Sequence, residues 1–101
     1  MDGYGTTFYS NGERHQSGEF IRGQLDGDNC CEFYPDGSLF RIGSYREGNP
    51  QGKVYEFYTN GVLKKAGEFV MGNLHGPNCK IYHEYGNLKY EGGMDSNVYH
   101  G

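Results

Sequence analysis

The feature that most constrains this chain is a set of glycines that recur in phase through four successive units. The first glycines of the four units are Gly12, Gly37, Gly61 and Gly86. They are separated by 25, 24 and 25 residues, and a second glycine follows each of them six residues later. Aromatic residues keep the same phase, because one stands four residues before each first glycine. Periodicity of this length indicates a repeat protein, in which each unit is one supersecondary element stacked on the next.

Each unit is predicted to be a β-hairpin. The segments "FYSNGE", "FYPDGS" and "FYTNGV" place Asn-Gly or Asp-Gly between β-favouring runs, which is the strongest local hairpin signal. The fourth turn, "HEYGN", keeps the glycine but lacks the Asn or Asp. A two-residue loop at Asn60-Gly61 predicts that Tyr58 faces Leu63 and that Glu56 faces Lys65.

The same register predicts further pairs in the other units and a role for the second glycine of each unit. The predicted pairs are Thr59–Val62, Val54–Gly67, Tyr34–Leu39, Glu32–Arg41, Cys30–Gly43, Thr7–Gln16 and Ile81–Tyr90. Gly67 lies two residues before Phe69, so both should point to one face of a strand. We expect that glycine to leave a shallow hole for a neighbouring ring.

The fold class predicted from these patterns is all-β, as one elongated, single-layer antiparallel sheet of tandem hairpins. The whole chain, residues 1–101, is predicted to be one array with units near 4–27, 28–52, 53–76 and 77–101. Alternation has period two and glycine interrupts every candidate helix, so no helix longer than a turn is expected. We also expect the array to be a section of something longer, or to be covered at its ends by a partner, because open sheet edges invite end-to-end or edge association.

Composition and charge argue against several classes of partner. The formal net charge is −4 and no run of like charge exists, which argues against nucleic acid and against anionic lipid as ligands. No secretion signal and no transmembrane stretch is recognisable, and three cysteines are few. Cys30 and Cys79 would stand two units apart, beyond disulfide reach, so reduced thiols and a cytoplasmic location are expected.

The sequence contains no complete motif for catalysis or for binding a cofactor or a metal. "GEFIRG" has the glycine spacing of part of a phosphate loop, but no Lys-Ser/Thr follows it. Asp26-Gly27-Asp28-Asn29 lacks the rest of a calcium loop. His75 and His100 occupy equivalent places in successive units, roughly 10 Å apart, which is too far for one zinc ion. The sequence therefore predicts no enzyme, no cofactor and no metal site.

The segments "YEGGM", "AGEFVMGNLHG" and "SGEFIRGQLDG" resemble the MORN (membrane occupation and recognition nexus) repeat. The period of 24–25 and the "FYxNGxL" turn resemble the longer MORN variant, and the likeness covers residues 3–101. The chain departs from the repeat pattern at Asn97, and at Ser17, Ile42 and Ala66 before the second glycine. The resemblance implies an elongated ribbon of hairpins that serves as a protein-binding scaffold, often at cytoskeletal or ciliary structures.

The primary functional hypothesis is therefore a non-catalytic scaffold that binds an extended or helical segment of another protein along an aromatic face. The residues predicted to bind it are Tyr9, Tyr34, Tyr58, Arg41 and Lys65. The tyrosines would be anchors and the cations would set polar register, although packing of the tyrosines inside the ribbon is an equal alternative. Two other functions stay open, namely peripheral binding of phosphoinositide membranes, which the family name suggests, and a role like that of bacterial MORN antitoxins.

Overall fold

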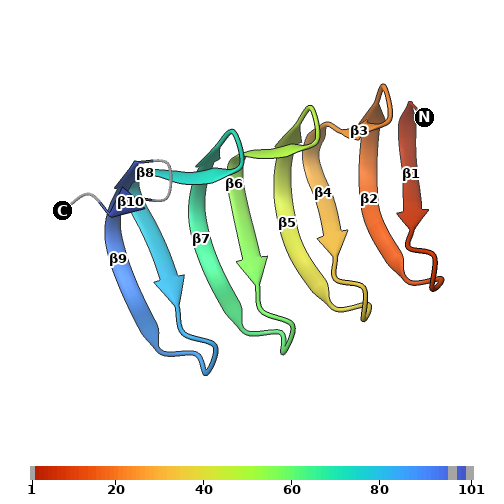
Figure 1. The fold of residues 1–101 in the computed structure, drawn as a ribbon. Coiled ribbons are helices and arrows are strands. Elements are labelled where there is room, and N and C mark those ends of the chain that lie inside the picture. The colour runs from red at the N-terminus through yellow and green to blue at the C-terminus, as the bar shows by residue number, and fades with distance from the viewer. Residues whose placement is uncertain (1, 96–97, 100–101) are drawn as a thin grey trace.

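The computed structural model describes residues 2–95 and 98–99, which form one open antiparallel sheet without a helix (Figure 1). The strands are β1 (Gly3–Phe8), β2 (Arg14–Ile21), β3 (Gln24–Leu25), β4 (Gly27–Phe33), β5 (Leu39–Arg46), β6 (Asn49–Phe57), β7 (Leu63–Val70), β8 (Asn73–Tyr82), β9 (Leu88–Asp95) and β10 (Val98–Tyr99). Their order is β1-β2-β4-β5-β6-β7-β8-β9-β10, and β3 pairs with β2. The predicted all-β ribbon is confirmed, with principal extents of 41 × 26 × 16 Å. The predicted end of the fourth unit lies outside the described residues.

The hairpin loops contain three residues, so the predicted two-residue loop is wrong. In the third hairpin the Tyr58 N–H donates to the Val62 carbonyl at 2.9 Å, and the Gly61 N–H donates to the Tyr58 carbonyl at 2.9 Å. Gly61 has φ +87°, which only glycine adopts without strain. This is a type I turn followed by a left-handed glycine, the usual three-residue hairpin loop.

A β-bulge after each turn restores the predicted register further along the strands. Phe57, not Tyr58, lies opposite Leu63, so Thr59–Val62 and Tyr58–Leu63 are not pairs, and Phe33 likewise replaces Tyr34 opposite Leu39. One extra residue, Lys64, then allows Glu56 to lie opposite Lys65. The remaining predicted pairs are confirmed: Val54–Gly67, Glu32–Arg41, Cys30–Gly43, Thr7–Gln16 and Ile81–Tyr90. The extra residue in the loop shifts the register by one position and the extra residue in the bulge shifts it back, so the pairs beyond the bulge are those predicted.

The fourth turn forms the same structure although it lacks Asn or Asp. The His83 N–H donates to the Asn87 carbonyl at 2.8 Å, and the Gly86 N–H donates to the His83 carbonyl at 2.9 Å. Gly86 has φ +100°. The backbone bonds and the glycine therefore suffice to close this turn.

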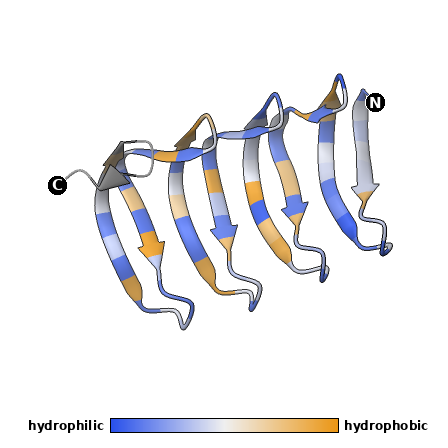
Figure 2. Cartoon of the chain, viewed as in Figure 1, coloured by the Kyte–Doolittle hydropathy of each residue, from blue (hydrophilic) through white to orange (hydrophobic). Residues whose placement is uncertain are grey.

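The hydrophobic core lies on one face of the sheet, which we call the front face. Phe20 lies opposite Leu25 and Phe69 lies opposite Leu74, so the members of each pair share a face. Most of the buried hydrophobic residues form two clusters: Phe20, Leu25, Cys30 and Tyr45, and then Val54, Phe69, Leu74, Cys79, Ile81 and Met94. Phe33, outside both clusters, is buried beneath Arg14, whose Cζ lies 4.3 Å from the centre of the ring. Figure 2 shows hydrophobic and hydrophilic residues alternating along the strands. We call the opposite face the back face.

The second glycine of each unit allows the next unit to pack closely, but no ring fills the space. A Cβ atom on Gly43 would lie 2.8 Å from Val54 Cα and 3.0 Å from Val54 Cγ2. Gly18 and Gly67 have the same relation to Cys30 and Cys79. The predicted hole exists, and a small side chain of the following unit occupies it because that side chain lies directly across the sheet.

Candidate protein-interaction site

The three predicted anchor tyrosines form a row on the front face near the turns, one in each of the first three units. Their hydroxyls all donate, at 2.7 Å, to a backbone carbonyl of the following unit. The donor and acceptor pairs are Tyr9–Phe33, Tyr34–Phe57 and Tyr58–Tyr82. The side chains are half-buried. The tyrosines therefore join successive units, and the surface that they can offer a partner is the ring rather than the hydroxyl.

Each tyrosine ring also packs against the bulge residue of its own unit. His15 stacks on Tyr9 with ring centroids 4.3 Å apart, and Phe40 lies 4.7 Å from Tyr34. In the third unit Lys64 Nζ lies 5.4 Å from the centre of the Tyr58 ring. The sequence analysis missed the bulge residues, because they are recognisable only once the bulge is known.

Two asparagines add a second bond between units at the turns. Asn11 Nδ2 donates to the Pro35 carbonyl at 2.8 Å. Asn60 Nδ2 donates to the Glu84 carbonyl at 2.9 Å. Asp36 occupies the equivalent position in the second unit, but its carboxylate has no N–H to donate. It accepts bonds from the Ser38 hydroxyl at 2.6 Å and the Ser38 N–H at 2.9 Å, and these bonds lower the pKa of Asp36.

Charged residues form a row across the front face, next to the tyrosines. Arg41 donates from Nε at 2.9 Å and from Nη2 at 2.6 Å to Glu32 Oε1, and the Tyr45 hydroxyl donates to the same oxygen at 2.7 Å. Burial, followed by the charge of Glu32, raises the pKa of Tyr45. Arg41 Nη1 also lies 3.7 Å from Glu56 Oε1. Arg41 is thus held by the ribbon between two buried carboxylates.

The other predicted cation, Lys65, is placed differently. Its Cα lies opposite that of Glu56, as predicted. The ion pair of Glu56 in that unit is with Lys64, whose Nζ lies 3.7 Å from Glu56 Oε2. Lys65 makes none of these ion pairs, and the residue is half-buried.

The three cysteines are free thiols. Cys30 and Cys79 are buried and Cys31 is half-buried, and burial raises the pKa of all three thiols. In the part of the chain that the structure describes, no three His, Cys, Asp or Glu side chains are grouped so that they could hold a metal ion. His100, which the sequence analysis compared with His75, lies outside that part.

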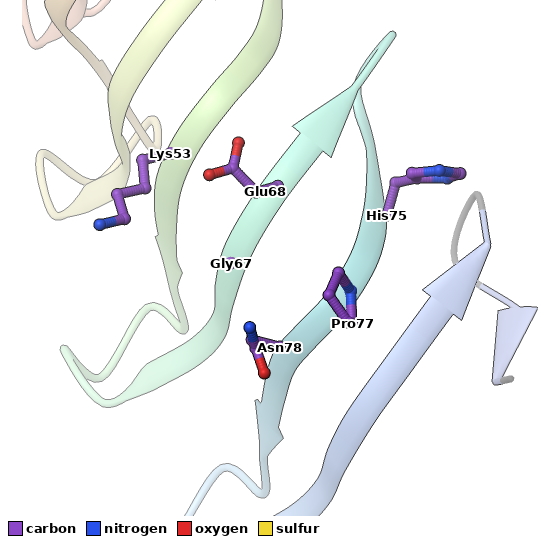
Figure 3. Close-up of a pocket in the computed structure, with 6 residues that line it drawn as sticks. All are labelled: Lys53, Gly67, Glu68, His75, Pro77 and Asn78. Atoms are coloured by element: carbon purple, nitrogen blue, oxygen red, sulfur yellow. The ribbon is translucent and has the colours of Figure 1, made fainter. Parts of the chain in front are cut away.

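Depressions in the described part of the sheet include the following two. One, of about 280 Å³, is lined by Lys53, Gly67, Glu68, His75, Pro77 and Asn78 on β6, β7 and β8 (Figure 3). The other, of about 360 Å³, is lined by Ile21, Arg22, Gln24, Asp26 and Glu47. Neither lining contains a nucleophile with a base beside it. The described residues also contain no helix that could span a membrane.

One comparison with known proteins identifies part of the chain. Residues 50–71, which cover most of the β6–β7 hairpin, match the family described as MORN repeat variant. No curated protein matches the chain. MORN repeats are generally protein-binding or membrane-binding modules without catalytic activity. The match supports a MORN repeat protein, as the resemblance implied.

Proposed function

We propose that this chain is a non-catalytic scaffold of four MORN-type hairpins that binds a segment of another protein along its front face. Residues 50–71 carry the family match, and the other three hairpins have the same turn bonds and the same bulge. The observation that carries the proposal is the row of Tyr9, Tyr34 and Tyr58, which repeats once per unit in one orientation. A row of this kind can contact a partner at regular intervals.

The spacing of the row defines the segment that it would bind. Units of two strands lie roughly 10 Å apart, so the three tyrosine rings span roughly 20 Å. That length corresponds to about six residues of extended chain or about 13 residues of helix. Lys65, opposite Glu56 on β7, would pair with an acidic residue of the segment, while Arg41 is held between Glu32 and Glu56. A cytoplasmic partner, in a cytoskeletal or ciliary assembly, belongs to the same proposal through the resemblance.

The test begins with affinity capture on the intact chain, followed by identification of the bound protein by mass spectrometry. Binding of that protein is then compared for the Tyr34→Ala/Tyr58→Ala and Tyr34→Phe/Tyr58→Phe double variants. The Phe variant keeps both rings and should keep most of the affinity. The Ala variant should lose a few kcal/mol, because interface tyrosines are frequent hot spots. Thermal melting of both variants checks that the sheet is intact at the assay temperature.

A second pair of variants separates this function from membrane binding. Lys64→Gln/Lys65→Gln removes two charges without placing a new carboxylate beside Glu56. Its effect on the protein partner should be small, because exposed charges mainly tune the association rate. The membrane hypothesis predicts the reverse ranking and strong weakening by salt. Tight, salt-sensitive binding to phosphoinositide vesicles that survives Tyr34→Ala/Tyr58→Ala would overturn the proposal.

A further inference from the structure

The back face of the sheet carries two apolar rows that no second layer covers within the described residues. Side chains that alternate along the strands and lie opposite one another share a face. The first row is Thr6, Ser17, Cys31, Ile42, Tyr55, Ala66, Lys80 and Glu91, each opposite the next. The second row, nearer the turns, is Phe8, Arg14, Phe33, Leu39, Phe57, Leu63, Tyr82 and Leu88. Eleven of these sixteen residues are aliphatic, aromatic or cysteine.

Four large apolar side chains of the two rows are exposed. The exposed fractions are 36% for Ile42, 45% for Tyr55, 60% for Phe8 and 49% for Leu88. Ile42 and Tyr55 lie on β5 and β6, at the middle of the ribbon, whereas Phe8 and Leu88 lie on β1 and β9, at its two ends. The exposed residues are therefore placed symmetrically about the boundary between β5 and β6.

This symmetry makes the back face complementary to itself. A two-fold axis parallel to the strands, at the boundary between β5 and β6, would lay β5 over β6 of a second copy and β1 over its β9. Ile42 would then face Tyr55 of the second copy, and Phe8 would face its Leu88. By the same operation Cys31 faces Ala66 and Leu39 faces Phe57. We propose that the back face binds the back face of a second copy of this chain, as a two-fold sandwich of sheets.

Charge is compatible with this arrangement. Only three of the sixteen residues in the two rows, Arg14, Lys80 and Glu91, are charged. At the ends of the first row, Lys80 would face the Ser17 hydroxyl and Glu91 would face the Thr6 hydroxyl. No like charges meet within the two rows.

The face is also large enough for a stable dimer. Its two long extents, 41 and 26 Å, correspond to an area on the order of 1,000 Å². A stable protein–protein interface buries about 800 Å² on each partner. Figure 1 shows the described strands as one open sheet. The tyrosine row lies on the other face and would point outward from both copies.

The test measures the mass of the chain in solution by sedimentation, over protein concentrations up to about 1 mM, where even a weak interface with a Kd in the micromolar range is fully formed. The expected result is a species of twice the 11.4 kDa mass of the chain. Ile42→Glu and Tyr55→Lys should each weaken the dimer by roughly 100-fold or more, because each buries an unpaired charge. Met71→Lys, a matched change at a residue that is 71% exposed outside the two rows, should leave the dimer unchanged.

Mixing the two monomeric variants provides the decisive arm. In a mixed dimer the introduced carboxylate of one copy would face the introduced ammonium of the other, so the mixture should recover the dimer. Circular dichroism of each variant confirms that the sheet is folded. A monomeric parent chain at about 1 mM, or a dimer that neither variant weakens, would overturn the proposal, since that concentration is far above the Kd of a specific interface of this size. Lack of recovery in the mixture would overturn the pairing of Ile42 with Tyr55 and with it the axis. Partner binding on the front face is not measured here, so the two proposals fail separately.

Discussion

Removal of one hydroxyl oxygen, by Tyr34→Phe, tests whether the tyrosines join the units. The variant keeps the ring beside Phe40 and deletes only the bond of 2.7 Å to the Phe57 carbonyl. A hydrogen bond contributes about 0.5–1.5 kcal/mol net, and the half-buried carbonyl would lose its donor, so we expect a loss of about 1–1.5 kcal/mol. For a domain of this size each 1 kcal/mol lowers Tm by roughly 4–8 °C.

Urea and thermal unfolding followed by circular dichroism provide the assay, and Tyr85→Phe provides the control. Tyr85, in the fourth turn and outside the two rows of the back face, is 73% exposed, and no hydrogen bond of its hydroxyl is found within residues 2–95 and 98–99. Removal of that hydroxyl should therefore change stability by no more than a few tenths of a kcal/mol. The triple variant Tyr9→Phe/Tyr34→Phe/Tyr58→Phe should lose about three times as much as Tyr34→Phe, because sites roughly 10 Å apart are nearly additive. If Tyr34→Phe and Tyr85→Phe were equally stable, the reasoning about the junctions would be refuted.

Three further predictions concern the glycines, one turn and one buried phenol. Gly43→Ala should lower the free energy of unfolding in urea by roughly 2–4 kcal/mol, since φ is +149° and the new Cβ meets Val54. Gly61→Ala has open space around the new Cβ, so it should lower that free energy by about 1–2 kcal/mol, through backbone strain alone. Equal losses for the two variants would contradict the packing argument. Asp36→Asn should raise Tm, because the amide can donate to the Thr59 carbonyl as the equivalent asparagines do; an unchanged Tm would show that this bond does not form. Burial raises the pKa of Tyr45 above its ordinary value near 10. The neutral phenol therefore contributes its full stability below pH 10, and this contribution is lost above pH 10 by up to about 1.4 kcal/mol per pH unit. In Tyr45→Phe the free energy of unfolding, measured as a function of alkaline pH, should decline less steeply.

The periodic part of the fold could be predicted from the sequence because it follows from spacing alone. Glycines and aromatics in phase at 24–25 residues require identical units, and Asn-Gly or Asp-Gly between β-favouring runs requires hairpins. The loop length could not be predicted in this way. Lys64 adds one residue to its strand and Thr59 adds one to the loop, and the two additions leave the distant pair Glu56–Lys65 unchanged. A register deduced by counting residues from the turn is therefore correct for distant pairs even when the loop length is wrong, so those pairs cannot reveal the error.

The candidate site was less predictable because its bonds cross between units. The sequence identified Tyr34 and Tyr58 as recurring aromatics, but period-two alternation does not say which carbonyl a hydroxyl will reach. The sequence shows that Asp36 stands where the third unit has Asn60. It does not show that the Asn60 amide donates to a carbonyl 24 residues further along the chain, a bond that Asp36 cannot donate. Placement of the tyrosine rings as anchors for a partner stays a prediction.

The direction of the backbone bonds has a mechanical consequence. In an antiparallel sheet these bonds run perpendicular to the strands, and here that direction is the long axis of the ribbon, with β1 and β9 near opposite ends of it (Figure 1). Tension applied through the termini would therefore load the bonds of an outer strand one after another, as a zipper opens, and would not shear a whole row at once. Each unit contacts only its neighbours, so it would yield separately and release about 80 Å of chain. A scaffold built in this way would lengthen in steps under load rather than resist it.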